Sequence, residues 1–120
     1  MGNVKDLVVF KKAYDLSLKI FLVTRNFPKE ERYSLTDQIR RSSRSVCVNI
    51  AESYQRRKYP DYFKSKLNDA LTENAETGIW LDFARDFGYI STIEHTELTF
   101  SNSEIGKLLA YMSTNYEKFM

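Results

Sequence analysis

Residues 38–58 read QIRRSSRSVCVNIAESYQRRK, and two stripes at helical spacing run through them and the residues just before them. The first stripe is mostly apolar and is predicted to face a core: Leu35, Ile39, Ser42, Val46, Ile50 and Tyr54. The second stripe is polar throughout: Gln38, Arg41, Ser45, Asn49, Glu52 and Arg56. A long amphipathic helix is therefore expected here, and the rest of the chain has to cover its apolar side.

The polar stripe carries Ser, Asn and Gln at positions where a solvated helix face usually carries Lys and Glu, which are better helix formers. Short hydrogen-bonding side chains suit a buried polar contact between helices, which selects register and partners at some cost in stability. We therefore interpret the stripe as a structural polar seam. An ordinary solvated face is the alternative interpretation.

The whole chain has the composition of a folded protein made of a few long elements. It has 120 residues, 42% of them apolar, with only four glycines and two prolines. A single domain spanning residues 1–120 is expected. The lone cysteine, Cys47, excludes an internal disulfide framework, and no apolar run reaches the length of a membrane span, so a cytoplasmic protein is expected.

Four helices are predicted, over about residues 8–26, 34–59, 60–87 and 91–119. Their boundaries follow from local signals: Phe27-Pro28 ends the first, Pro60 opens the third, and Gly88 closes it in a left-handed conformation. With short connections and no stretch that alternates as a strand, the fold class is all-α, an antiparallel up-down-up-down four-helix bundle.

Two further local expectations concern caps and a bend. Ser34 is expected to cap the second helix with its side chain, and Ser91 and Glu94 are expected to form a capping box on the fourth. The poor helix formers Ser101-Asn102-Ser103 predict a bend or break in the fourth helix.

The predicted first helix has more apolar surface than one neighbour needs. One stripe holds Ala13, Leu16, Ile20, Val23 and Phe27, and a second holds Phe10, Tyr14, Ser17 and Phe21, with Leu18 and Leu22 further round. Charge is also divided unevenly, because residues 1–59 hold 13 Lys and Arg against 6 Asp and Glu, while residues 60–120 hold 5 against 10. Both features favour a homo-oligomer with head-to-tail contacts, although the charged halves could also attract each other within one chain.

No catalytic, cofactor or metal site is predicted. The single His95 has no Cys or His companion at metal-ligand spacing, and Cys47 lies among apolar residues with no group nearby to form a thiolate. Glu73 and Glu76 are three residues apart but lack the Glu-x-x-His partner of di-metal bundles. An enzyme is therefore not expected.

Basic residues on the second helix raise the hypothesis of nucleic-acid binding, to RNA or DNA. The candidate contacts are the cations that fall off the apolar stripe: Arg40, Arg44, Arg57 and Lys58. Arginine and lysine contact phosphates, and the neighbouring Tyr54 and Tyr59 could stack on unpaired bases. The alternative is that these cations serve surface ion pairs and assembly.

The stretch FPKEERYSLTDQIRRSSRSVCVNIAESYQR, residues 27–56, resembles the signature of the four-helix bundle proteins encoded in intervening sequences of bacterial 23S ribosomal RNA genes. The matching residues are Phe27, Pro28, Glu31, Tyr33, Leu35, Gln38, Arg41, Ser45, Asn49, Ile50, Ala51, Glu52 and Arg56. The third helix matches as well, at Ala70, Glu76, Leu81, Ala84 and Phe87-Gly88-Tyr89-Ile90. Ser53 and Thr72-Glu73 depart from small residues that are usual in the family.

The resemblance implies an antiparallel bundle that assembles into a ring, similar to known pentamers, and no catalytic residues. It also implies kinship with accessory proteins of diversity-generating retroelements, which bind nucleic acid. It extends the structural polar seam to Glu76. The leading hypothesis is a non-enzymatic, self-assembling scaffold or adaptor with sequence-nonspecific nucleic-acid binding, and the alternative is a purely protein-binding oligomeric adaptor.

Overall fold

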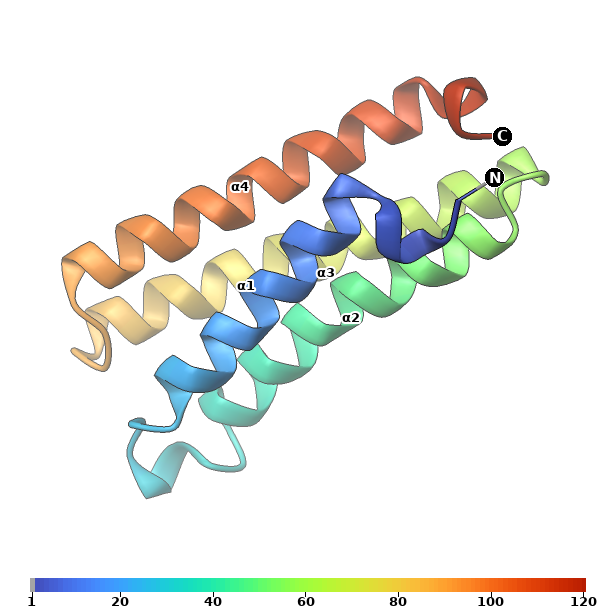
Figure 1. Cartoon of the computed structure of the whole chain (residues 1–120). Coiled ribbons are helices and arrows are strands. Elements are labelled where there is room, and N and C mark those ends of the chain that lie inside the picture. The colour runs from blue at the N-terminus through green and yellow to red at the C-terminus, as the bar shows by residue number, and fades with distance from the viewer. Residues whose placement is uncertain (1) are drawn as a thin grey trace.

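The computed structural model describes residues 2–120, and this part of the chain contains four long helices and no strand. The helices are α1 (Val8–Thr24), α2 (Leu35–Gln55), α3 (Pro60–Asp86) and α4 (Thr92–Thr114). They run antiparallel in sequence order, so the α1–α2 and α3–α4 connections share one end of the bundle, and the α2–α3 turn lies at the other (Figure 1). The predicted all-α, up-down-up-down bundle is confirmed.

The core lies along the axis of the bundle, and the helix pair α2 and α3 forms its most extensive contact. Every residue of the predicted apolar stripe on α2 is buried: Leu35, Ile39, Ser42, Val46, Ile50 and Tyr54. On α3, seven residues alternate at spacings of four and three, and all of them are buried: Phe63, Leu67, Ala70, Asn74, Thr77, Leu81 and Ala84. Apolar burial along these stripes is the main stabilising contribution, because most helices in proteins depend on packing rather than on propensity.

Local signals determine the two ends of α3 and the start of α4 as predicted. Pro60 occupies the first turn of α3, and Gly88 ends the helix with φ +78°. The N–H of Tyr89 donates to the carbonyl of Ala84 at 2.8 Å, and Gly88 N–H donates to Arg85, which together form a Schellman motif. Ser91 and Glu94 form the predicted capping box at the start of α4.

The first two helices are shorter than predicted at their C-terminal ends. α1 ends at Thr24 rather than near residue 26, and α2 ends at Gln55 rather than near residue 59. In both places the following N–H groups bond to carbonyls three residues back, as when Arg56 N–H donates to Ser53. The chain thus tightens into a turn before either proline, where sequence carries no sharp stop signal.

Ser34 precedes α2 but does not cap it with its side chain, contrary to the prediction. The Glu31 carboxylate takes that role, accepting the Leu35 N–H at 3.2 Å and the Ser34 hydroxyl at 3.0 Å. The Tyr89 hydroxyl donates to the same carboxylate at 2.8 Å. This hydrogen bond, aided by those from Leu35 and Ser34, lowers the pKa of Glu31.

The expected bend at residues 101–103 is absent, because α4 runs through them as one helix. Asn102 lies buried against α3, where its amide donates to the Asn74 carbonyl at 3.0 Å. The Asn74 amide donates in return to the side-chain and backbone oxygens of Asn102, both at 2.9 Å. Gly106 leaves room for this pair, since a Cβ there would lie 2.7 Å from Asn74 Oδ1.

A second buried hydrogen bond joins α2 to α3, between the hydroxyls of Ser42 and Thr77 at 2.7 Å. Together with the pair of Asn74 and Asn102 it forms a polar layer inside an otherwise apolar core. Such a layer disfavours helix registers that would leave these groups unpaired. The spacing in the sequence places Ser42, Asn74 and Thr77 on core stripes but identifies neither their partners nor the buried position of Asn102.

Candidate interaction surfaces

The predicted polar seam has six residues on α2 or just after it and one, Glu76, on α3, and none of the seven is buried within one chain. Five are half-buried: Gln38, Ser45, Asn49, Glu52 and Glu76. Arg41 and Arg56 are exposed. Burial of the seam inside the bundle was therefore the wrong expectation, because the apolar stripe of α2 already fills the interior. A structural role for the seam in contacts with other molecules stays a prediction.

The acidic seam residues bond to partners that the sequence patterns did not indicate. Glu52 pairs with Lys66 of α3, with 3.2 Å between the ammonium and the carboxylate. Glu76 accepts the indole N–H of Trp80 at 3.1 Å. Burial and the nearby Glu76 raise the pKa of Glu73, and Arg41 opposes the shift, but no ion pair joins Arg41 to either glutamate in residues 2–120.

The pair of Glu52 and Lys66 leads to a small expected effect on stability. The two side chains remain 46% and 27% exposed. Exposed pairs of this kind contribute about 0–1 kcal/mol because water screens them. Glu52→Ala should lower the free energy of unfolding by less than about 1 kcal/mol in a urea titration. A loss of about 3–5 kcal/mol would instead show that another molecule covers and desolvates the seam.

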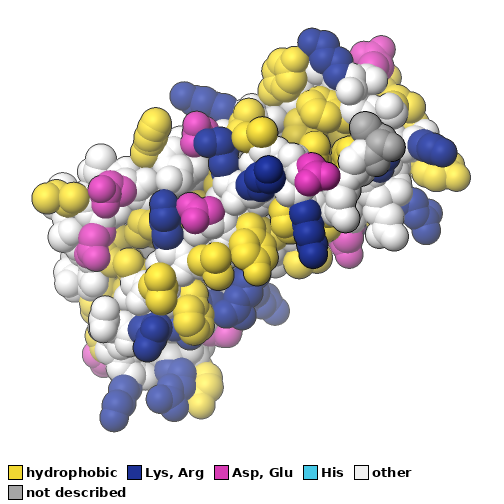
Figure 2. Space-filling view, in the orientation of Figure 1, with side chains coloured by type: hydrophobic (Ala, Val, Ile, Leu, Met, Phe, Trp, Pro, Cys, Tyr) yellow, Lys and Arg dark blue, Asp and Glu magenta, His cyan; other side chains and the backbone are white. Residues whose placement is uncertain are grey.

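The outer face of α1 is an exposed apolar surface. Tyr14, Leu18 and Leu22 are 52%, 49% and 56% exposed, and Phe21 lies beside them. Figure 2 shows hydrophobic side chains gathered along α1, with Lys and Arg side chains beside the connection to α2. The predicted second stripe of the first helix is therefore only partly covered: Phe10 packs against the core and Arg40 lies over Phe21, whereas Tyr14 stays exposed.

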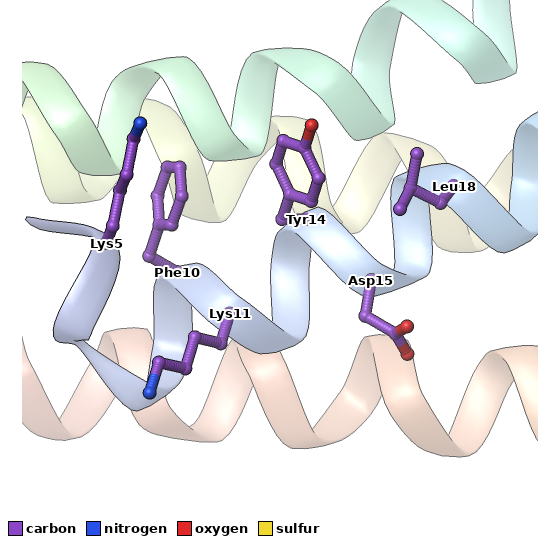
Figure 3. Close-up of a pocket in the computed structure, with 6 residues that line it drawn as sticks. All are labelled: Lys5, Phe10, Lys11, Tyr14, Asp15 and Leu18. Atoms are coloured by element: carbon purple, nitrogen blue, oxygen red, sulfur yellow. The ribbon is translucent and has the colours of Figure 1, made fainter.

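A shallow groove of about 460 Å³ runs along the N-terminal half of this face. In Figure 3, Phe10 and Tyr14 project from one side of α1, and Lys11 and Asp15 project from the other. Lys5 and Leu18 complete its lining. Aromatic and aliphatic surface bordered by charges is typical of protein contacts rather than of a small-molecule pocket.

Charges of the two chain halves pair only weakly with each other inside the bundle. Among residues 2–120, Lys12 and Glu104, at 3.1 Å, are the one ion pair between a cation of the first half and an acid of the second. Glu52 and Lys66 form the one pair in the opposite sense. Ion pairs within one chain therefore involve few of the charges that are divided unevenly between its two halves.

The structure separates the four predicted nucleic-acid contacts into two groups. Arg40 and Arg44 lie near the start of α2, whereas Arg57 and Lys58 follow its end. At about 1.5 Å per residue the two groups are roughly 20 Å apart along the bundle. They cannot form one patch on a single subunit.

Exposure of these four cations differs from the expectation as well. Arg44 and Lys58 are exposed, but Arg40 and Arg57 are half-buried. Arg40 donates from Nε to the Thr24 hydroxyl at 2.8 Å and lies over the Phe21 ring. Arg57 donates to the Tyr54 carbonyl and lies 4.1 Å from that ring's centroid. Each of these two guanidinium groups thus lies over an aromatic ring of the same chain, a contact that spacing in the sequence does not reveal.

Further basic residues join Arg40 and Arg44 in a groove of about 430 Å³ along the first half of α2. We call this surface the arginine groove, and it is lined by Arg32, Thr36, Asp37, Arg40, Arg41, Arg44, Ser45 and Val48. Arg32 comes from the connection before α2. Sequence reasoning missed Arg32 and Thr36 as site residues, because the contribution of a connecting segment depends on how it folds back.

An exposed aromatic surface lies next to the arginine groove. We call it the aromatic cleft, a depression of about 420 Å³ lined by Glu31, Tyr33, Ser34, Leu35, Gln38, Trp80, Phe83 and Phe87. The rings of Trp80, Phe83 and Phe87 contact one another in sequence, with centroids 6.0 and 5.6 Å apart. Their spacing on one stripe was visible in the sequence, but the contribution of Tyr33 was not.

Cys47 and His95, which were considered as catalytic or metal-binding residues, take part in packing and in a contact between helices. Cys47 is buried, and burial raises the pKa of its thiol to about 11, so it stays protonated and packs as a small apolar residue. His95 bonds to Asp82 at 2.8 Å, joining α4 to α3. No group of three His, Cys, Asp or Glu side chains in residues 2–120 is placed to hold a metal ion. Within the same residues, no helix is both long and apolar enough to cross a bilayer.

The protein is a small four-helix bundle, and its distinctive features are the apolar face of α1, the arginine groove and the aromatic cleft. The chain belongs to the family of 23S rRNA-intervening sequence proteins, whose model matches residues 5–111. This confirms the family resemblance seen in the sequence.

A solved structure agrees with this assignment. It is a protein with unknown function from the S23 ribosomal protein family of Bacteroides thetaiotaomicron VPI-5482. The two chains are 31% identical with a TM-score of 0.82, over 92% of this chain and 98% of that one. No curated protein matches the sequence. Neither match is described as an enzyme.

Proposed function

We propose that this protein is a non-enzymatic, self-assembling scaffold or adaptor whose subunits meet along α1 and whose assembly binds nucleic acid without sequence preference. The observation that carries the proposal is the exposed apolar face of α1, with Tyr14, Leu18, Phe21 and Leu22. Monomeric proteins rarely leave contiguous apolar surface of this kind uncovered. A second copy is the proposed partner, because the chain halves carry opposite charges that pair little within one subunit.

A heterologous contact between copies closes into a ring when its rotation permits. A pentamer is the ring size that the family resemblance implies. The kinship with accessory proteins of diversity-generating retroelements and a cytoplasmic location are parts of the same hypothesis. The competing function is an oligomeric adaptor that binds only proteins, and the nucleic-acid titration described below separates the two.

Assembly is tested by light scattering on the purified chain. The expected mass is several times the 14.1 kDa of one chain. Leu18→Glu with Leu22→Glu should reduce it to that of a monomer, because two carboxylates on the contact face would have to be desolvated. Ile93→Glu, at an exposed position of α4, is the matched control and should leave the mass unchanged. A wild-type mass of 14.1 kDa at micromolar concentration would exclude the proposal.

A further inference from the structure

The arginine groove and the aromatic cleft are neighbouring surfaces of α2. Gln38 lines the cleft and Arg41 lines the groove, and the two residues are three positions apart on the helix, hence side by side. Arg32 and Tyr33, consecutive in the connection before α2, line the groove and the cleft respectively. A ligand lying in the groove can therefore continue into the cleft without crossing an intervening element.

The arginine groove carries an excess of positive charge, with four arginines among its lining residues. No ion pair in residues 2–120 involves any of its four arginines, and Asp37 is the one acid among its lining residues. The buried Thr36 hydroxyl has no hydrogen-bond partner among residues 2–120. At the start of α2 the Glu31 carboxylate accepts the Leu35 N–H, and the N–H groups of Thr36 and Asp37 have no acceptor within residues 2–120. The unpaired arginines favour an anion in the groove.

One arginine of the groove is held in place before any ligand arrives. Arg40 donates to the Thr24 hydroxyl at 2.8 Å, and its guanidinium lies 4.5 Å from the centroid of the Phe21 ring. Burial, followed by the charges of Arg44 and Arg25, lowers the pKa of Arg40, consistent with a positive potential around it. A fixed guanidinium loses less conformational entropy on binding than a free one does.

The aromatic cleft offers ring faces beside this charge. Tyr33 is 86% exposed, and Phe83 and Phe87 are also exposed. Bases of a single strand can stack on such rings regardless of sequence, whereas the bases of a duplex are already stacked on one another. A basic groove beside exposed aromatic rings is the combination found in proteins that bind single-stranded nucleic acid.

We infer that the arginine groove and the aromatic cleft form one track for single-stranded nucleic acid, with phosphates along the groove and unpaired bases against the cleft. The inference rests on the proposed nucleic-acid binding and assigns it to particular residues. It adds Arg32, Arg41 and Tyr33 to the contacts, and it leaves Arg57 and Lys58 outside the track because they lie at the other end of α2.

The test is a fluorescence-anisotropy titration of labelled single-stranded RNA, single-stranded DNA and duplex DNA across several salt concentrations. Arg41→Gln with Arg44→Gln should weaken single-strand binding at least about 10-fold and reduce the salt slope by about 1.4, since each phosphate contact contributes about 0.7 for single strands. Arg57→Gln with Lys58→Gln removes the same charge at the far end and should have a much smaller effect. Light scattering and melting temperatures confirm that all variants assemble and fold.

The aromatic part is tested by Tyr33→Ala, with Tyr59→Ala as a control at an exposed tyrosine of the other end. Tyr33→Ala should weaken single-strand binding about 5- to 100-fold, the range expected for loss of one stacked base, and leave duplex binding unchanged. An unchanged single-strand affinity would exclude base stacking in the cleft.

Three other outcomes separate this inference from the function on which it rests. The Arg41→Gln, Arg44→Gln variant and the Arg57→Gln, Lys58→Gln variant could lose equal single-strand affinity. That result would show that binding follows overall charge, and it would overturn the proposed track. Competition by poly-glutamate as effective as that by a single strand would identify the groove as a site for acidic protein segments. Absence of binding by the wild-type oligomer at low salt would refute the proposed nucleic-acid function itself, and the protein-binding adaptor would replace it.

Discussion

Replacing Phe63 with alanine is expected to lower the free energy of unfolding by about 3–5 kcal/mol. Phe63 is fully buried at the start of α3, and its ring lies 6.4 Å from that of Phe119 in the short turn η3 (Tyr116–Phe119). Alanine would leave a cavity that the packed helices fill only in part, so lost burial and lost contacts add together. The measurement is a urea titration followed by circular dichroism at fixed chain concentration.

Phe100→Ala is the matched control, because Phe100 is also helical but mostly exposed. Its expected cost is within about 0.5 kcal/mol. Since assembly adds to apparent stability, both variants are compared in the monomeric background of Leu18→Glu and Leu22→Glu as well. Similar costs for the two phenylalanines would contradict the assignment of Phe63 to the core.

The second large effect is expected at the buried polar layer. Asn102→Ala should cost about 2–4 kcal/mol, because it removes a donor and an acceptor and leaves the Asn74 amide with incomplete bonding inside the core. The two residues exchange three hydrogen bonds of 2.9–3.0 Å. Asn68→Ala, at an exposed position of α3, is the control and should have little effect.

A double-mutant cycle shows whether the two asparagines act as a unit. Asn74→Ala in the presence of Asn102→Ala should cost at least about 1 kcal/mol less than in the wild type, because its partner is already gone. Additive losses would mean that each side chain contributes through packing alone. The outcome decides whether the buried polar layer selects the helix register, a role that the sequence analysis had assigned to the polar seam.

Features with local causes were predictable from the sequence. Pro60 can occupy only the first turn of a helix, and Gly88 takes a φ of +78° that other residues rarely adopt. The capping box of Ser91 and Glu94 needs only residues within one turn. The buried stripes of α2 and α3 were likewise predictable, because hydrophobic periodicity reports directly which face packs.

Features that depend on distant partners were not predictable. Ser34 has the right side chain for a cap, but its hydroxyl donates to the carboxylate of Glu31, which Tyr89 also contacts. Asn102 belongs to a stretch of poor helix formers, yet α4 is continuous through it and Asn102 bonds to Asn74 of α3. In both cases a side chain bonds to a group that the local pattern did not indicate, and for Asn102 that group lies 28 residues away in the chain.

The candidate surfaces show the same division. A polar stripe such as Gln38, Arg41 and Ser45 has the same period whether it is buried or lies at a half-open groove, so periodicity identified the stripe but not its environment. Which cations gather was decided by the tertiary structure. Folding of the connection brings Arg32 to Arg40 and Arg44, and the length of α2 keeps Arg57 away from them.

The sequence by itself therefore determined the helical architecture, the core stripes and the family, because these depend on spacing and on residues close in the chain. Only the tertiary structure decided which polar groups meet inside the core and which exposed residues share a surface. Those properties depend on how each helix is rotated against its neighbours, and the rotation results from the packing of all four helices together.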